Sequence, residues 1–228
     1  MSVAIVEAPS AGARKTAAVA AALTGVALFM TVASIDVPHK ASDAKLLAWW
    51  QESGNRTAGF VSGMSAFCVA VFLPIAFNYL RRLRSTDAAP AWTSFAGSMA
   101  GAVSALWLVT GAVRASISHL VDVIDEPLPG ADVLRFATGL NYTLLGLSGM
   151  GVMGLFIVAV SVVVHRTAAL ARWVAYSGFF CGGVILVAFA IRFGAFATML
   201  AVLWFFAFGV GIWRQPLVAP GIRVPSEA

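Results

Sequence analysis

The sequence is poor in charge. Only 11% of its 228 residues are Asp, Glu, Lys or Arg, whereas a soluble domain carries about 25%. A water-soluble fold of this size needs a charged surface to cover its core, and the charged residues here are bunched between long apolar runs. Because 60% of the residues are apolar, the composition predicts an integral membrane protein.

The sequence also has few of the residues that support catalysis or cofactor binding. Its two cysteines, Cys68 and Cys181, lie apart inside apolar runs, so no disulfide framework is indicated and both are predicted to be packing residues. It has no phosphate-binding glycine loop of the P-loop type, so nothing indicates an ATPase. No cofactor is predicted.

The basic residues do not indicate a nucleic-acid-binding surface. The net charge is +5, but the lysines and arginines lie in short clusters at the ends of the apolar runs. That position is typical of residues that set membrane topology and contact anionic lipid headgroups. Membrane lipids are therefore predicted partners, and nucleic acid is not.

Six transmembrane helices are predicted from uncharged stretches of about 20 residues, the length of helix that crosses roughly 30 Å of hydrocarbon. They form an all-α domain of residues 16–213, between an N-terminal tail of residues 1–15 and a C-terminal tail of residues 214–228. The predicted spans are residues 16–35, 58–80, 93–113, 142–164, 173–191 and 193–213. Only Arg192 separates the last two, and a tight helical hairpin is predicted there because one continuous helix would be about twice the membrane thickness.

The loops between these spans alternate in charge. Loops on the side of the two tails carry nine basic and three acidic residues, and the other loops carry six basic and seven acidic residues. The positive-inside rule therefore predicts that both termini are cytoplasmic. The spans themselves contain no Asp, Glu, Lys, Arg or His, which argues against a proton relay, a Schiff-base lysine and a di-histidine haem site.

A short amphipathic helix is predicted between the first two spans. It would begin at Ser42 or Asp43 as its cap and end near Gly54. Leu46 and Trp50 fall on one face together with the intervening Leu47, away from the charged side chains. This pattern predicts a helix that lies in the outer interface of the membrane.

The third and fourth spans are predicted to extend outside the membrane. No proline or turn signal interrupts residues 91–124, and 34 residues make about 50 Å of helix. The chain then turns at Glu126-Pro-Leu-Pro-Gly130, and Asp132 is predicted to cap the next helix. The two extensions would form an antiparallel hairpin with a polar seam.

The polar seam of this hairpin is the candidate functional site, and no residue is assigned a catalytic role. The candidate ligand-binding residues are Arg114, Ser118, His119, Arg135, Thr138 and Tyr142. The candidate metal ligands are His119, Asp122 and Glu126, which fall on adjacent helical turns. A solvated acidic helix end, paired with Arg114 and Arg135, has the same pattern and is the favoured interpretation.

Small residues recur at four-residue spacing in several spans. Gly59 and Gly63 are one such pair, and Gly97 and Gly101 lie within another run. Small side chains let membrane helices approach closely. Internal packing is the favoured interpretation, and a dimer or a protein partner at these faces is the alternative.

Two segments carry a resemblance to known proteins. They are the stretch SDAKLLAWWQESGNRT of residues 42–57 and the stretch DEPLPGAD of residues 125–132. Together with the Ala-, Val- and Gly-rich spans, they resemble a group of uncharacterised actinobacterial multi-pass membrane proteins. The resemblance implies six helices and a bacterial inner membrane, and it implies no activity.

Three functional interpretations follow from the sequence. The first is a non-enzymatic protein: an accessory subunit of a membrane assembly, or a binder of a lipid or small molecule at an outward-facing site between the third and fourth spans. The second is a transporter or channel for a neutral or apolar solute, because a charge-free interior needs no counter-ion. The third is a membrane enzyme that acts at the outer face through His119 and the nearby carboxylates.

Overall fold

A computed structural model describes residues 10–38, 40–83 and 88–216, so most of both predicted tails lies outside the described residues. Every regular element in the described part is helical, which confirms the all-α prediction. The α-helices are α1 (Ala11–Ala33), α2 (Asp43–Gln51), α3 (Ser53–Arg81), α4 (Pro90–Asp122), α5 (Ala131–Tyr142), α6 (Met150–Thr167), α7 (Arg172–Ala190) and α8 (Thr198–Trp213). A π-helix, Thr143–Gly149, joins α5 to α6, and a 3₁₀-helix, Gly194–Ala197, precedes α8.

Five helical segments of the described chain are long and apolar enough to cross a membrane. They are α1, α3, α4, α7 and the continuous rod that α5, the π-helix and α6 form together. The predicted sixth span, α8, is apolar but has only 16 residues. By helix length and hydropathy the chain is a multi-pass integral membrane protein, and the predicted count of six full-length spans is not confirmed.

The turn between α7 and α8 lies at the predicted residue. Arg192 adopts a left-handed backbone conformation with φ of 62°. Its backbone N–H donates to the carbonyl of Phe189 at 3.0 Å, and the N–H of Phe193 donates to the carbonyl of Ala188 at 2.6 Å. The chain then passes through the 3₁₀-helix, which takes up residues predicted to begin the sixth span and leaves α8 short.

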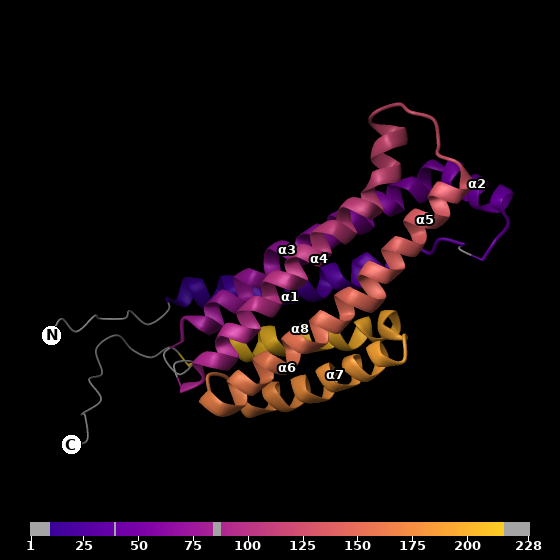
Figure 1. Ribbon diagram of the computed structural model, residues 1–228. Coiled ribbons are helices and arrows are strands. Elements are labelled where there is room, and N and C mark those ends of the chain that lie inside the picture. The colour runs from indigo at the N-terminus through magenta and orange to yellow at the C-terminus, as the bar shows by residue number, and fades with distance from the viewer. Residues whose placement is uncertain (1–9, 39, 84–87, 217–228) are drawn as a thin grey trace, which may run out of the picture.

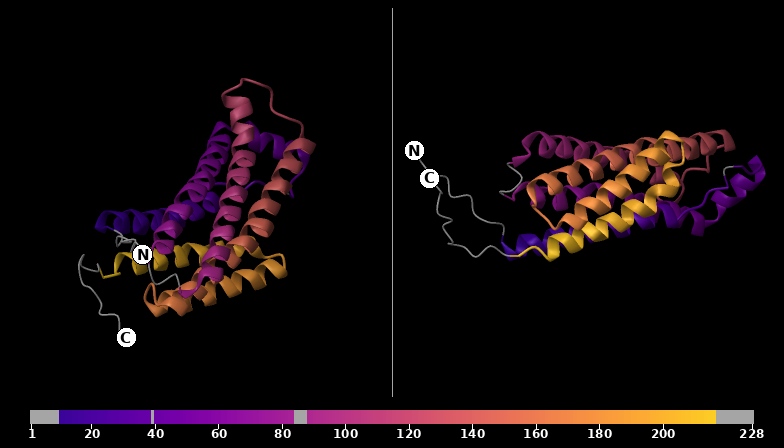
Figure 2. Two further views of the ribbon diagram at one scale, coloured as in Figure 1. Left: turned by 60° about the vertical axis from the view of Figure 1, so that its left-hand side comes forward. Right: turned by 90° about the horizontal axis from the view of Figure 1, so that it is seen from below.

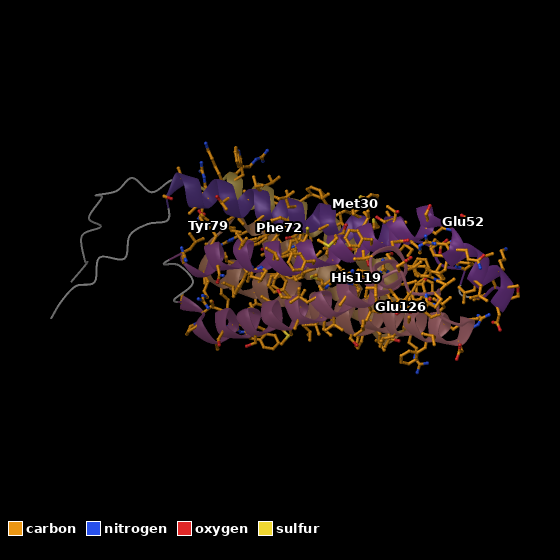
Figure 3. The ribbon with its side chains drawn as sticks, turned by 90° about the horizontal axis from the view of Figure 1, so that it is seen from above. Met30, Glu52, Phe72, Tyr79, His119 and Glu126 are labelled. Atoms are coloured by element: carbon orange, nitrogen blue, oxygen red, sulfur yellow. The ribbon has the colours of Figure 1, made fainter. Side chains whose placement is uncertain are left out.

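Both described chain ends lie at one end of the bundle. The Arg14 side chain donates to the backbone carbonyl of Gln215, and the Tyr79 hydroxyl donates to Gln215 Oε1 at 2.9 Å. Gln215 Nε2 donates in turn to the carbonyl of Ala169 at 3.0 Å. These contacts bring the start of α1, the end of α3, the α6–α7 connection and the end of α8 together. We call this the terminal end, and Figure 3 shows Tyr79 there with Glu52 and Glu126 at the opposite, distal end.

Close helix contacts form the bundle. α1 and α8 run side by side (Figure 2), although they are the first and last helices of the described chain.

Where α3 and α4 pack together, a Cβ built on Gly63 would lie 2.7 Å from the carbonyl oxygen of Gly111. Internal packing is therefore confirmed for the predicted small residue Gly63. Gly101 faces outward, and a Cβ there would meet no atom within 4 Å.

The distal end has a buried apolar cluster of its own. α4 is uninterrupted over 33 residues, about 50 Å, and the α4–α5 connection projects well beyond the α7–α8 turn (Figure 1). The cluster contains Val37, Leu46, Trp50, Ile117 and Leu134. The predicted helix is present as α2, but it ends at Gln51, and Gly54, where it was predicted to end, lies in the first turn of α3. Its apolar residues Leu46 and Trp50 are buried in this cluster.

The start of α5 also differs from the sequence-based expectation. Gly130 occupies the N-cap position, and Asp132 lies in the first turn of the helix. A carboxylate in the first turn still favours the helix dipole, because the N-terminus carries partial positive charge. The predicted cap is therefore displaced by two residues, while the predicted proline-rich turn lies where expected.

Candidate functional site

The central feature of the distal end is a buried arginine. Arg114 on α4 is only 7% exposed. Its Nε donates to Asn141 Oδ1 at 2.9 Å, and its Nη1 donates to the backbone carbonyl of Thr31 and to the hydroxyl of Ser62. The side chain thus joins α1, α3 and α5 to α4. No carboxylate of the described residues forms an ion pair with it.

The position of Arg114 is explained by the end of α1. α1 ends at Ala33, so the carbonyl of Thr31 has no donor one turn later in the same helix. Arg114 supplies a donor, and the Ser62 hydroxyl supplies a second one at 2.6 Å. The C-terminal end of a helix carries partial negative charge, which stabilises a nearby cation. Arg114 therefore caps a helix that is distant in sequence.

A second arginine, Arg56 on α3, binds the C-terminal end of α2 where the chain passes from α2 to α3. Its Nη1 donates to the carbonyls of Trp50 at 3.0 Å and Gln51 at 2.7 Å, and its Nε pairs with Asp122 at 2.7 Å. The hydroxyl of Ser118 donates to the backbone carbonyl of Arg56. Arg56 thus satisfies orphan carbonyls of one helix and binds the end of another.

A third arginine, Arg135 on α5, holds the start of α2. It donates to Asp43 Oδ1 from Nε at 3.0 Å and from Nη2 at 2.6 Å, and Nη2 also donates to the carbonyl of Ala41 at 2.7 Å. Both charged side chains are partly or largely exposed, at 37% and 70%. This pair therefore positions α2 against α5 and contributes little to stability.

The structure separates the predicted acidic cluster. Asp122 pairs with Arg56, while His119, Asp125 and Glu126 are exposed. Within the described ranges, no group of three or more His, Cys, Asp or Glu residues could hold a metal ion. The expected pairing of the cluster with Arg114 and Arg135 is wrong for both arginines. α4 turns Arg114 into the bundle, and Arg135 forms its ion pair with Asp43.

Two cavities adjoin α5 at the distal end. The larger, about 240 Å³, is lined by Leu46, Arg135, Thr138, Gly139 and Tyr142. The smaller, about 20 Å³, is lined by Ile35, Val37, Trp50, Val113, Arg114, Ile117, Ala137, Thr138 and Asn141. Thr138 lines both, so the cavities lie on adjacent faces of the same helix.

The cavities bring together part of the predicted site. The predicted face of Arg135, Thr138 and Tyr142 lines the larger cavity, opposite α2 instead of α4. Ser118 and His119 line neither cavity. Trp50 and Asn141 were missed as site residues. Trp50 fits an ordinary apolar helix face, and Asn141, a polar residue at the start of an apolar run, is typical of helix packing. For Arg114 there was a signal: it directly follows an apolar run in a helix that does not end there.

Comparison with known protein families, with curated proteins and with solved structures finds no match. The class of the protein therefore rests on its helices: it is a multi-pass helical membrane protein by length and hydropathy. The similarity to actinobacterial membrane proteins stays a resemblance.

Proposed function

We propose that this chain is a non-enzymatic membrane protein that binds a lipid or another amphipathic small molecule in the larger distal cavity. The mixed lining of that cavity carries the proposal. Leu46 and Gly139 offer apolar contact, whereas Thr138 and Tyr142 carry hydroxyl groups. Ligand pockets commonly measure about 300 to 1,000 Å³, so a cavity of about 240 Å³ suits a headgroup or a short part of a chain.

The charge of the lining favours a neutral or zwitterionic headgroup. Arg135 is the charged residue of the lining, and its guanidinium is paired with Asp43 through two hydrogen bonds. A bound anion would have to compete with that carboxylate. A ligand with hydroxyl or carbonyl groups needs no such competition, because neutral hydrogen bonds suffice.

Another face of α5 exposes apolar side chains. Val133, Phe136 and Leu140 on α5 are exposed, and Phe136 is 71% exposed. Large exposed apolar side chains mark contact with lipid or with another protein. A protein partner on this face is the alternative that the same exposure supports, and the outward-facing Gly101 on α4 offers a second surface for association.

The membrane arrangement that we propose has six crossings, with both ends cytoplasmic in a bacterial inner membrane. α1 begins and α8 ends at the terminal end, where Arg14 contacts Gln215. If the five longer segments cross, α8 must cross as well to return the chain to that end. The excess of basic residues in the loops of the terminal end supports its cytoplasmic location.

A cavity-filling variant tests the proposed binding. Gly139→Leu would place a side chain into the larger cavity, and a Cβ at this position meets no atom within 4 Å. We expect native mass spectrometry of the full chain in mild detergent to show a bound lipid or small molecule that the variant loses. Gly183→Leu on α7 is the matched control, because a Cβ there also meets no atom within 4 Å.

The two variants separate specific binding from the annular lipid that any membrane protein carries. Annular lipid would remain equally in Gly139→Leu and Gly183→Leu. Equal retention of every bound molecule by both variants would therefore refute the proposed site.

A further inference from the structure

Residues that line the smaller distal cavity carry hydrogen-bond donors that have no acceptor among the described residues. Trp50 is 5% exposed, and its indole Nε1 is buried with no hydrogen-bond partner in the described structure. Buried polar groups in proteins nearly always have a partner. The indole N–H can only donate, so its missing partner must be an acceptor.

Arg114 and Asn141 add further donors to the same lining. The hydrogen bonds of Arg114 use Nε and Nη1, so Nη2 has no acceptor among the described residues. Asn141 accepts from Arg114 through Oδ1, which leaves its amide nitrogen as a donor. The Thr138 hydroxyl already donates to the carbonyl of Leu134 at 2.8 Å. The polar lining thus consists mainly of N–H groups.

The positive charge of Arg114 in the cavity lining is not paired with any carboxylate of the described residues. The protein acceptors of Arg114 are neutral: a backbone carbonyl, a hydroxyl and an amide oxygen. Asp36, which lies in the chain between the lining residues Ile35 and Val37, is exposed and forms no ion pair with Arg114. A buried cation without a counter-charge is costly, and an anion in the cavity would offset that cost.

We propose that the smaller cavity binds one anionic acceptor atom between the Arg114 guanidinium and the Trp50 indole. A volume of about 20 Å³ exceeds the roughly 10 to 15 Å³ needed for a single water, so the cavity suits one atom and excludes a whole phosphate or carboxylate group. Two sources fit this chemistry: a free halide, or an anionic oxygen of a molecule in the adjoining larger cavity. The halide source does not depend on the proposed lipid-binding function.

Thermal unfolding of the full chain in detergent tests the halide source. The unfolding midpoint is measured in sodium chloride or bromide against sodium gluconate at constant ionic strength. We expect a saturable rise with halide, because a ligand that binds only the folded state stabilises it. In Trp50→Phe, which keeps an aromatic ring and removes the N–H, the apparent halide affinity should fall by about tenfold or more.

Two further variants sharpen this test. Trp49→Phe is the matched control, because Trp49 lies on the same helix and does not line the cavity; its halide response should equal that of the unmodified protein. Asn141→Asp would place a carboxylate where Arg114 already donates at 2.9 Å. The new charge would compensate Arg114 and repel an anion, so the protein should fold and its halide response should disappear.

The second source is tested by binding of phosphatidylethanolamine, a zwitterionic lipid that carries an anionic phosphate oxygen, to the detergent-solubilised protein. If the acceptor is a ligand oxygen, halide has no effect and Trp50→Phe weakens phosphatidylethanolamine binding while Trp49→Phe does not. Halide stabilisation that persists in Gly139→Leu assigns the free ion even if the larger cavity binds nothing. If neither halide response nor lipid affinity changes in Trp50→Phe and Asn141→Asp, the anion site is refuted.

Discussion

Arg114 Nη1 donates a hydrogen bond to the backbone carbonyl of Thr31, which lies 83 residues earlier in the chain. The donor comes from the middle of the polypeptide and the acceptor from the last turn of its first long helix. The Arg114 side chain therefore caps the C-terminal end of α1 and is hydrogen-bonded to Ser62 on α3 and to Asn141 on α5. The same guanidinium lines the smaller cavity. Arg114 therefore both caps α1 and belongs to the candidate site.

Replacement of Arg114 should destabilise the distal end. Arg114→Gln is expected to lower the free energy of unfolding by about 1 to 3 kcal/mol, because three charge-assisted hydrogen bonds are lost while the cost of burying the charge is relieved. Chemical unfolding in mixed micelles measures the change. Arg166→Gln is the control, since Arg166 is exposed at the end of α6. Equal stability of the two variants would contradict the capping role.

The sequence predicted the helices much better than the site. Apolar runs of about 20 residues located the long helices, and the Arg192 and Glu126–Gly130 signals located the turns, because these features depend on local residues. The partners of the distal arginines could not be predicted. Arg56 and Asp122 are 66 residues apart, and Arg135 and Asp43 are 92 apart. A charge pattern within one segment gives no information on such pairs.

The contact between Gly63 and Gly111 should be intolerant of any side chain. In Gly63→Ala the new Cβ would lie 2.7 Å from the carbonyl oxygen of Gly111, so α3 and α4 would have to separate. We expect a loss of about 1 to 3 kcal/mol in unfolding free energy. Gly101→Ala on α4 is the control: no atom lies within 4 Å of its Cβ, and alanine favours the helix by up to about 1 kcal/mol. A Gly63→Ala protein as stable as Gly101→Ala would exclude the close approach.

Arg56 and its partner Asp122 should contribute unequally to stability. Asp122→Asn is expected to cost at most about 1 kcal/mol, because the carboxylate side chain is 37% exposed. Arg56→Gln is expected to cost about 1 to 3 kcal/mol, since it also deprives the carbonyls of Trp50 and Gln51 of their donor. Glu126→Gln, at an exposed position, serves as the control.

Metal analysis of the same proteins tests the alternative for this cluster. If these carboxylates have a structural role only, the unmodified protein should contain no bound metal that Asp122→Asn or Glu126→Gln removes. Stoichiometric zinc or manganese in the unmodified protein, lost in both Asp122→Asn and Glu126→Gln, would instead support the metal site predicted from the sequence.

The orientation of the bundle can be tested by single-cysteine labelling. Cys68 packs against the main core and Cys181 is buried, so replacing both with alanine should leave expression and assembly largely intact. In that background, Ser42→Cys places an exposed thiol at the distal end, while Ala171→Cys and Pro216→Cys place exposed thiols at the terminal end.

Because the terminal end carries the excess of basic residues, we expect an impermeant maleimide to label position 42 from outside intact cells. Positions 171 and 216 should react only after the membrane is permeabilised.

Position 171 precedes α7 and position 216 follows α8. If both positions are protected, α7 and α8 either both cross the membrane or both fail to cross it. Labelling of a cysteine in the α7–α8 turn, Phe193→Cys, from outside decides for crossing. Labelling of position 171 from outside, with position 42 protected, would show the opposite orientation. Labelling of position 216 alone from outside would show that α8 does not return the chain to the cytoplasm.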